Sequence, residues 1–270
     1  MKLSEILRRL LVERWCVICE EPIPYDDNEP FCRDCIEDWK EFLKVKCRKC
    51  GRDHNLCTCL PQKVRKINHS VACWCVFYDA STNGNIKTLF NVMKRQYDYE
   101  IIQLCAERMK KSLLRVAKHR NINLREYVVT YAPRRRVNVI RYGCDQSQKL
   151  AGAIAKKLGL KVITTFRHVG DTEQKGLNKN ERAVNAMANY EFIEGSLKGN
   201  TNIILVDDIM TSGATFYACA FKLYKNGATS VIPVAFAKDN YNEKGAKRNV
   251  KRNSIRTITR TVKNFVRNGP

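Results

Sequence analysis

Acidic residues and long apolar runs are both scarce in this 270-residue sequence. It contains 27 Asp and Glu against 49 Lys and Arg, which leaves a formal net charge of +22. Such a balance favours polyanionic partners, either nucleic acid or phosphorylated small molecules, although a basic proteome or selection for solubility would also produce it. No apolar run approaches the roughly 20 residues of a membrane-spanning helix. We therefore expect no membrane span.

The N-terminus lacks the features of a secretory signal, because Glu5, Arg8, Arg9 and Glu13 interrupt its apolar positions. Those apolar positions fall at helical spacing, so residues 1–14 are predicted to form a short amphipathic helix. Without such a signal we expect a cytoplasmic protein, whose thiols stay reduced.

Eight of the thirteen cysteines lie between residues 16 and 59, in close pairs. A C-x2-C pair places two thiolates on one tight turn, and two such pairs complete a tetrahedral Zn²⁺ site. A redox function would instead use one such motif beside a βαβ unit. The predicted ligands form two sites, the first of Cys16, Cys19, Cys32 and Cys35 and the second of Cys47, Cys50, Cys57 and Cys59.

In the second site the C-x-C pair is tighter than usual, and His54 is an alternative ligand. Few large apolar residues lie in this stretch, so residues 15–60 are predicted to be a zinc-ribbon region folded mainly by its two metal ions. The other five cysteines are predicted to be small buried hydrophobic residues without chemistry: Cys73, Cys75, Cys105, Cys144 and Cys219.

Strands and helices alternate over residues 71–240, after a basic, Pro-containing stretch at 61–70 that is predicted to be a linker. The predicted strands are 71–78, 126–132, 160–166, 203–206 and 230–237, and the predicted helices are 84–96, 98–118, 145–158 and 215–226. This alternation predicts an α/β fold with an open, mostly parallel sheet. Residues 241–270 are a basic tail, either helical or solvated.

The stretch "IILVDDIMTSGAT" (203–215) predicts a binding site. Asp207 and Asp208 follow a buried strand, where carboxylates are costly unless they face a ligand, and ligands of open α/β sheets bind beyond the carboxyl ends of the strands. The turn at 211–215 leads into a helix N-terminus, whose N–H groups and dipole favour phosphate, and Gly213 permits close approach. The stretch is neither a Walker loop nor a Rossmann loop. It predicts a sugar-phosphate site, with the acids on two vicinal hydroxyls and the loop on the phosphate.

The same stretch resembles the 5-phosphoribosyl-1-pyrophosphate (PRPP) motif of type I phosphoribosyltransferases. The resemblance implies a sheet of that kind, with Asp207 and Asp208 on the ribose hydroxyls. It implies that the 5′-phosphate is bound by Thr211, Ser212, Gly213, Ala214 and Thr215. It also implies Mg²⁺ that bridges the ribose hydroxyls and the pyrophosphate.

Cysteine ribbons ahead of such a domain resemble the ComF (competence protein F) family. The segments that carry this resemblance, to about residue 240, are "FYDASTNGNIKTLFNVMKRQYD" (77–98), "TYAPRRR" (130–136) and "TEQKGLNKNERAVN" (172–185). The family commonly shows R-G-F-N-Q, whereas this chain has "YGCDQ" (142–146) with Tyr142 in place of the arginine. Arg141 or Arg134–Arg136 are the candidates for the missing contact with an anion.

A working phosphoribosyltransferase positions a nucleophile against C1 of the ribose and stabilises the departing pyrophosphate with cations. The candidate catalytic cations are Arg134, Arg135 and Arg136 in the proline-containing loop, and Lys175 and Arg182 on a predicted mobile flap. No acceptor base can be named from the sequence.

Three functions follow. The first is a PRPP- or nucleotide-binding factor of DNA uptake in natural transformation, which contacts single-stranded DNA through its charge and through aromatic residues such as Trp74, Tyr97 and Tyr99, unless these are core residues. The second is an active phosphoribosyltransferase, a glycosyltransferase of nucleotide metabolism. The third is a zinc-ribbon adaptor for a helicase-like protein of DNA import.

Overall fold

The computed structural model describes residues 14–24, 30–67, 71–78, 88–89, 91–92, 99–170 and 187–240. Four of the sequence predictions lie wholly or mostly outside these residues: the N-terminal helix 1–14, the helix 84–96, the flap with Lys175 and Arg182, and the basic tail 241–270. All of the described residues belong to one compact unit, which ends at Asn240.

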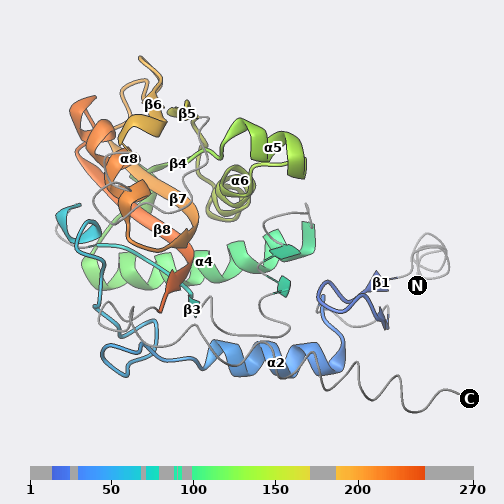
Figure 1. Cartoon of the computed structure of the whole chain (residues 1–270). Coiled ribbons are helices and arrows are strands. Elements are labelled where there is room, and N and C mark those ends of the chain that lie inside the picture. The colour runs from blue at the N-terminus through green and yellow to red at the C-terminus, as the bar shows by residue number, and fades with distance from the viewer. Residues whose placement is uncertain are drawn as a thin grey trace, which may run out of the picture. The chain divides into compact units, whose positions relative to one another are not determined.

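A four-stranded parallel sheet forms the centre of this unit (Figure 1). Its strands are β3 (Val76–Tyr78), β8 (Ser230–Asp239), β7 (Asn202–Met210) and β4 (Val128–Tyr131), in that spatial order. All three pairings are parallel. The runs "IILV" and "VIPVAFA" are buried throughout, as expected for parallel strands covered on both faces. The predicted α/β fold with a mostly parallel sheet is confirmed.

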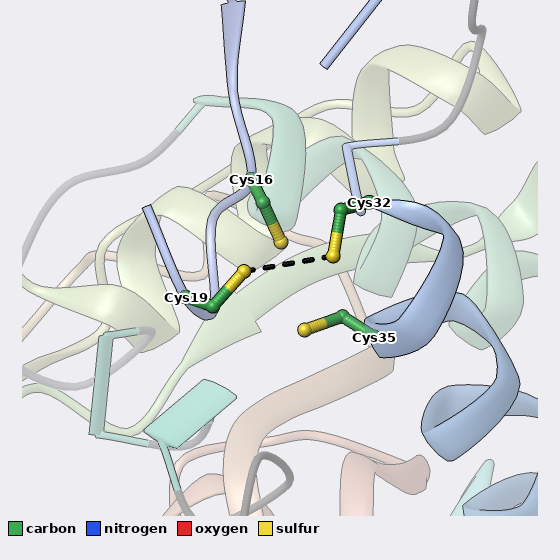
Figure 2. Close-up of side chains that lie close together, drawn as sticks. All are labelled: Cys16, Cys19, Cys32 and Cys35. Carbon is green, nitrogen blue, oxygen red and sulfur yellow. Dashed lines mark hydrogen bonds between the residues drawn. The ribbon is translucent and has the colours of Figure 1, made fainter. Parts of the chain in front are cut away.

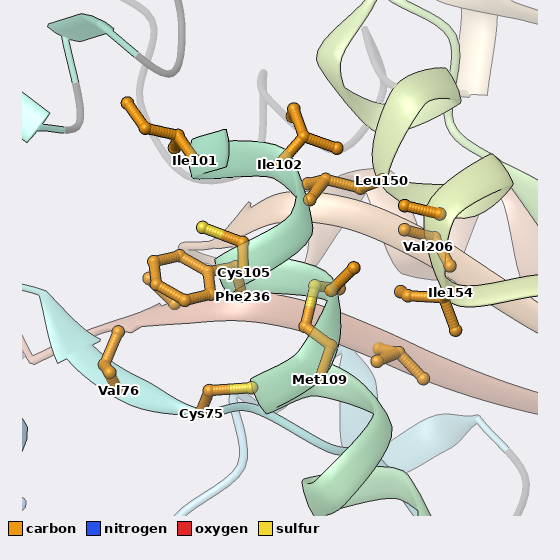
Figure 3. Packing of buried hydrophobic residues seen from close by; sticks show 14 of the residues in the cluster. Cys75, Val76, Ile101, Ile102, Cys105, Met109, Leu150, Ile154, Val206 and Phe236 are labelled. Atoms are coloured by element: carbon orange, nitrogen blue, oxygen red, sulfur yellow. The ribbon is translucent and has the colours of Figure 1, made fainter. Parts of the chain in front are cut away.

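Helices cover both faces of the sheet. Alternate residues of β7 divide between two hydrophobic clusters: Ile204 and Val206 join the cluster of α4 (Tyr99–Arg120) and α6 (Gln146–Leu158), whereas Ile203 and Leu205 join that of α8 (Ala214–Lys225). Figure 3 shows the first cluster, where side chains of α4 lie between α6 and β8. This arrangement places the carboxyl ends of β4 and β7 beside the N-termini of α6 and α8.

The caps of α6 are those that the sequence predicts. The Asp145 carboxylate accepts a hydrogen bond from the Gln148 N–H, and Gly159 ends the helix with a left-handed φ of 68°. A side-chain acceptor at the N-cap satisfies one of the amide groups that the first turn leaves without a partner.

The predicted strand 160–166 is wrong in extent. Only Val162 forms a bridge with β4, at Val129, and the chain then turns into a separate antiparallel hairpin of β5 (Phe166–His168) and β6 (Tyr190–Phe192). The Thr130 and Thr165 hydroxyls, both fully buried, hydrogen-bond to each other at 2.7 Å. Together with the backbone hydrogen bonds from Val129 N–H to Lys161 O (2.8 Å) and from Ile163 N–H to Val129 O (2.9 Å), this side-chain bond holds the segment against β4, where the sequence pattern predicted a longer ladder.

The cysteine-rich region shares a hydrophobic core with the sheet. It contains a short hairpin of β1 (Arg14–Trp15) and β2 (Pro22–Ile23) and the helix α2 (Arg33–Leu43). Trp39 of α2 is buried and stacks on Phe236 of β8 with ring centroids 6.3 Å apart. Its ring also receives the Arg108 guanidinium of α4 at 5.1 Å. Burial of Trp39 therefore stabilises this region in addition to any bound metal. The small number of large apolar residues in the region did not predict this stabilisation.

Residues 61–67, the described part of the predicted linker, pack closely against the rest of the chain. They include the short 3-10 helix η1 (Val64–Lys66). Val64 is 0% exposed and Ile67 is 2% exposed, both within the cluster of α8. Among the helices of the described residues, none has both the length and the apolar character needed to cross a membrane.

Candidate functional site

Asp207 and Asp208 lie near the carboxyl end of β7, as the sequence predicts. The strand itself continues further than the predicted Val206, since Asp207 pairs with Ala235 and Met210 pairs with Lys238 on β8. A short turn then leads to Gly213, which is the N-cap of α8. The two acids and the helix N-terminus therefore lie within one strand–turn–helix unit.

A cavity of about 300 Å³ opens beside these acids. Its lining includes five of the predicted site residues: Arg134, Arg135, Asp207, Asp208 and Thr215. Four further lining residues belong to the segments that carried the family resemblance: Ala132, Pro133, Gln146 and Ile209. The other four lie outside those segments: Asn138, Ser147, His168 and Tyr190. The predicted residues Arg136, Thr211, Ser212, Gly213 and Ala214 do not line it.

Asp207 is the most strongly perturbed acid of the site. Its Oδ1 accepts hydrogen bonds from the Ser147 hydroxyl and from the Asp208 N–H, both at 2.9 Å. Burial, and next the neighbouring Asp208 carboxylate, raise the pKa of Asp207 well above its ordinary value. Two adjacent carboxyl groups that line a cavity and are partly removed from water favour a ligand that brings hydroxyl donors or a cation.

Arg134, which lines the same cavity, is held in place by three contacts. Its backbone N–H donates to the Asp145 carboxylate at 2.7 Å, and its guanidinium donates to the Gln146 side-chain oxygen. The guanidinium also lies 5.2 Å from the centroid of the Tyr142 ring. The aromatic face of Tyr142 therefore lies against this cation and helps to orient it.

Tyr190 and His168 bring the β5–β6 hairpin to the site. The Tyr190 hydroxyl hydrogen-bonds to Thr215, and burial is the main cause that raises the pKa of Tyr190 well above its ordinary value. The His168 ring meets the Tyr190 ring edge-on, with centroids 5.1 Å apart. The Gly170 N–H donates to His168 Nδ1 at 3.3 Å, which ties the ring to the chain that follows β5. No motif in the sequence marks these two residues.

Gly213 has a left-handed φ of 74°, and residues 61–67 pack directly against it. A Cβ at this position would overlap the Val64 Cγ2 methyl and lie 3.5 Å from Pro61 Cβ. The close approach that the sequence predicts for Gly213 is therefore made by the chain's own 61–67 segment. That segment fixes the position of the turn before α8.

Two groups of four cysteines have their sulfur atoms gathered as a metal would need. The groups are Cys16, Cys19, Cys32 and Cys35 (Figure 2), and Cys47, Cys50, Cys57 and Cys59; within each, all sulfur atoms lie within 4.8 Å of one another. The Cys19–Cys32 and Cys50–Cys57 sulfur distances are 3.5 Å and 3.7 Å. A tetrahedral Zn²⁺ with bonds of about 2.3 Å separates its sulfurs by about 3.8 Å, so each group can hold a zinc ion.

The two groups use the same turn. Glu20 N–H donates to Cys16 O and Gly51 N–H donates to Cys47 O, with left-handed φ of 61° and 69° after each C-x2-C pair. Burial raises the pKa of the first cysteine of each pair, but hydrogen bonds from the turn outweigh it and bring the pKa of Cys16 and of Cys47 to about 7. These thiols are thereby prepared for the deprotonated form that binds metal.

His54 is not a member of the second group. Burial, and next the charge of Arg115, lower the pKa of His54 to about 4, so the ring is neutral at pH 7. All thirteen cysteines are free thiols. The five outside the two groups are buried as predicted: Cys73, Cys75, Cys105, Cys144 and Cys219.

Trp74 does not stack on a ligand at the surface. It is only 4% exposed and contacts Phe77 in the core, so its predicted alternative role as a core residue is confirmed. Tyr99 is 58% exposed, and Tyr97 lies outside the described residues.

The fold and the site together define an α/β protein with a ligand cavity at the carboxyl ends of parallel strands and two tetracysteine groups. No protein-family model matches the chain, and no curated protein matches it. Among solved structures, it is similar to the crystal structure of purine phosphoribosyltransferase from Pyrococcus horikoshii Ot3, with 15% identity over 55% of this chain and 89% of that chain and a TM-score of 0.31. Because the identity and the TM-score are both low, function is inferred from this chain's own residues.

Proposed function

We propose that the chain binds PRPP with Mg²⁺ in the cavity at the ends of β4 and β7. The observation that carries the proposal is the position of Asp207 and Asp208 on one wall, with Arg134 and Arg135 on the same cavity and Thr215 at the start of α8. Acids for hydroxyls, a helix N-terminus for phosphate and arginines for pyrophosphate are the three groups that PRPP requires. The resemblance of residues 203–215 to the PRPP motif supports the same ligand.

Each group has a distinct task in this proposal. Asp207 and Asp208 accept hydrogen bonds from the two ribose hydroxyls. The 5′-phosphate is bound at the start of α8, where Thr215 lines the cavity and the turn 211–214 lies just outside its lining. Arg134, oriented by Tyr142 and Gln146, meets the charge of the pyrophosphate. Mg²⁺, when bound, supplies further positive charge for the pyrophosphate and the hydroxyls. Displacement of pyrophosphate from C1 by an acceptor is the reaction that this arrangement would serve.

Calorimetric titration with PRPP tests the ligand. With Mg²⁺ we expect a single site per chain, and binding weaker without the metal because the pyrophosphate charge is then met by arginines alone. Ribose 5-phosphate, which lacks pyrophosphate, is the matched ligand and is expected to bind at least tenfold more weakly, since it loses charge-assisted hydrogen bonds of about 1.5–3 kcal/mol each. No binding of PRPP with Mg²⁺ would reject the proposal. Release of pyrophosphate with an added base would establish the transfer reaction of nucleotide metabolism.

We further propose that the protein acts in the cytoplasm in DNA uptake for natural transformation and contacts single-stranded DNA. The net charge of +22 and the resemblance to the ComF family favour this role over nucleotide metabolism alone. In this role the tetracysteine region would also bind a helicase-like protein of DNA import. Capture of that protein by the full chain would detect the interaction.

Binding of a single-stranded oligonucleotide at two salt concentrations tests the contact with DNA. A protein that neutralises several phosphates is expected to lose affinity by at least about tenfold between 50 and 200 mM salt, because counterions released on binding must be recovered. Binding that is absent at low salt, or insensitive to salt, would contradict the DNA role and leave PRPP binding unaffected.

A further inference from the structure

The second tetracysteine group lies against the C-terminal end of β8. Asn240, one residue after that strand, is 4% exposed. Its side-chain amide donates to Lys46 O and accepts from Arg48 N–H, both at 2.9 Å. Lys46 and Arg48 are the neighbours of Cys47 on either side. One buried amide thus fixes the backbone on both sides of a metal-ligating cysteine.

Lys238 is a buried lysine in the same place. It is 7% exposed, and its ammonium lies 5.1 Å and 5.3 Å from the ring centroids of Trp74 and Phe77. Among the ion pairs of the described residues, none joins Lys238 to a carboxylate. An ammonium in such surroundings is costly unless an anion accompanies it.

The second tetracysteine group is a source of negative charge beside the same rings. Cys47 and Cys57 belong to the same buried cluster as Trp74 and Phe77. Lys238 lies only two residues before Asn240, whose side chain is hydrogen-bonded to the backbone on both sides of Cys47. A zinc ion held by four thiolates leaves two net negative charges in this cluster.

We propose that Lys238 and Asn240 complete the second metal centre. Lys238 supplies the counter-charge for the zinc–thiolate group, and Asn240 holds the turn that presents Cys47. Outer residues of this kind commonly change metal affinity 10–100-fold. The centre is then assembled from residues almost 200 positions apart, so it depends on the folded sheet and is not an autonomous ribbon.

The experiment uses the full zinc-loaded chain and measures zinc release to a chromogenic chelator. The unsubstituted chain is expected to hold two zinc ions, and a Cys50→Ser variant identifies the release phase of the second centre. Lys238→Met keeps the apolar stem and removes the charge, so it is expected to weaken the second centre roughly 10–100-fold and leave the first unchanged. Lys161→Met, at an exposed lysine, is the matched control and is expected to change neither phase.

Melting of the metal-free chain separates a metal role from a merely structural one. Lys238→Met is expected to melt higher than the unsubstituted chain without metal, because the buried charge is gone, whereas a structural lysine would lower melting equally with and without zinc. Asn240→Ala is expected to weaken the second centre alone, and Lys238→Arg to retain zinc because it retains the charge. Unchanged release from both Lys238→Met and Asn240→Ala, or a single zinc per unsubstituted chain, overturns the proposal.

Discussion

Replacing Asp207 and Asp208 together by asparagine is expected to abolish PRPP binding and to leave the fold intact. The Oδ1 atom of an asparagine at 207 can still accept from Ser147 and from the backbone N–H of residue 208, so the local structure is kept. In the proposed complex the ribose hydroxyls, however, lose two carboxylate acceptors. Hydrogen bonds to charged groups contribute about 1.5–3 kcal/mol each, so the affinity should fall at least roughly 100-fold. Calorimetry with PRPP and Mg²⁺ measures the loss.

The single variant Asp207→Asn is expected to be more stable than the unsubstituted chain at pH 7. Because the folded state raises the pKa of Asp207, the native protein binds its proton more tightly than the unfolded chain does. Stability therefore falls as the pH rises from the ordinary aspartate pKa of about 3.9 through the raised value, by roughly 1.4 kcal/mol per pKa unit. The variant avoids this loss of stability. Its melting temperature should therefore exceed that of the unsubstituted chain by about 2–4 °C for each kcal/mol gained in the free energy of unfolding.

The gain in melting temperature should disappear below about pH 4, where the carboxyl group is protonated in both states. Glu126→Gln, at an exposed carboxylate just before β4 and away from the cavity, is the control and should change neither melting nor PRPP affinity. Unchanged PRPP affinity in the double variant would show that the two acids do not bind the ligand. Such a gain in stability at the expense of binding is common at functional sites.

The sequence predicts the parts of this site that are local in the chain. Asp207, Asp208 and Thr215 are found because an apolar run, two acids and small residues follow one another, although residues 211–214 between them do not line the cavity. The caps of α6 are found for the same reason. Ser147, His168 and Tyr190 are missed because they reach the cavity from other elements, namely α6 and the strands β5 and β6, and only the tertiary fold brings them there.

Long-range packing also explains the other differences. Trp39 makes α2 part of the core only because Phe236 and Arg108 are placed against it. The basic composition of residues 61–70 predicts a linker, yet Val64 is buried because it fills the space that Gly213 leaves. Neither contact has a signal within a short window of sequence, since each depends on residues distant in the chain.

Gly213→Ala is expected to destabilise the protein by about 2–5 kcal/mol and to weaken PRPP binding strongly. A left-handed φ costs a residue with a Cβ roughly 1–2 kcal/mol, and forcing a methyl group into a packed site costs about 1–3 kcal/mol more. The new Cβ would overlap Val64, so the turn must move away from residues 61–67 and carry the phosphate-binding amides with it. Thermal melting and PRPP calorimetry measure the two effects.

Gly159→Ala is the matched control for the prediction at Gly213. Gly159 has a φ of 68°, close to the 74° of Gly213, but a Cβ there would meet nothing within 4 Å. The Gly159→Ala variant should therefore lose only the stability that the left-handed backbone costs, and it should bind PRPP with normal affinity. Val64→Ala combined with Gly213→Ala removes the overlapping methyl and should lose less stability than the two single changes added together. If Gly213→Ala lowers stability and PRPP affinity no more than Gly159→Ala does, residues 61–67 do not position the turn before α8. If Gly213→Ala lowers both more than Gly159→Ala does, and Val64→Ala restores part of the loss, the segment 61–67 that follows the second metal centre is part of the ligand site.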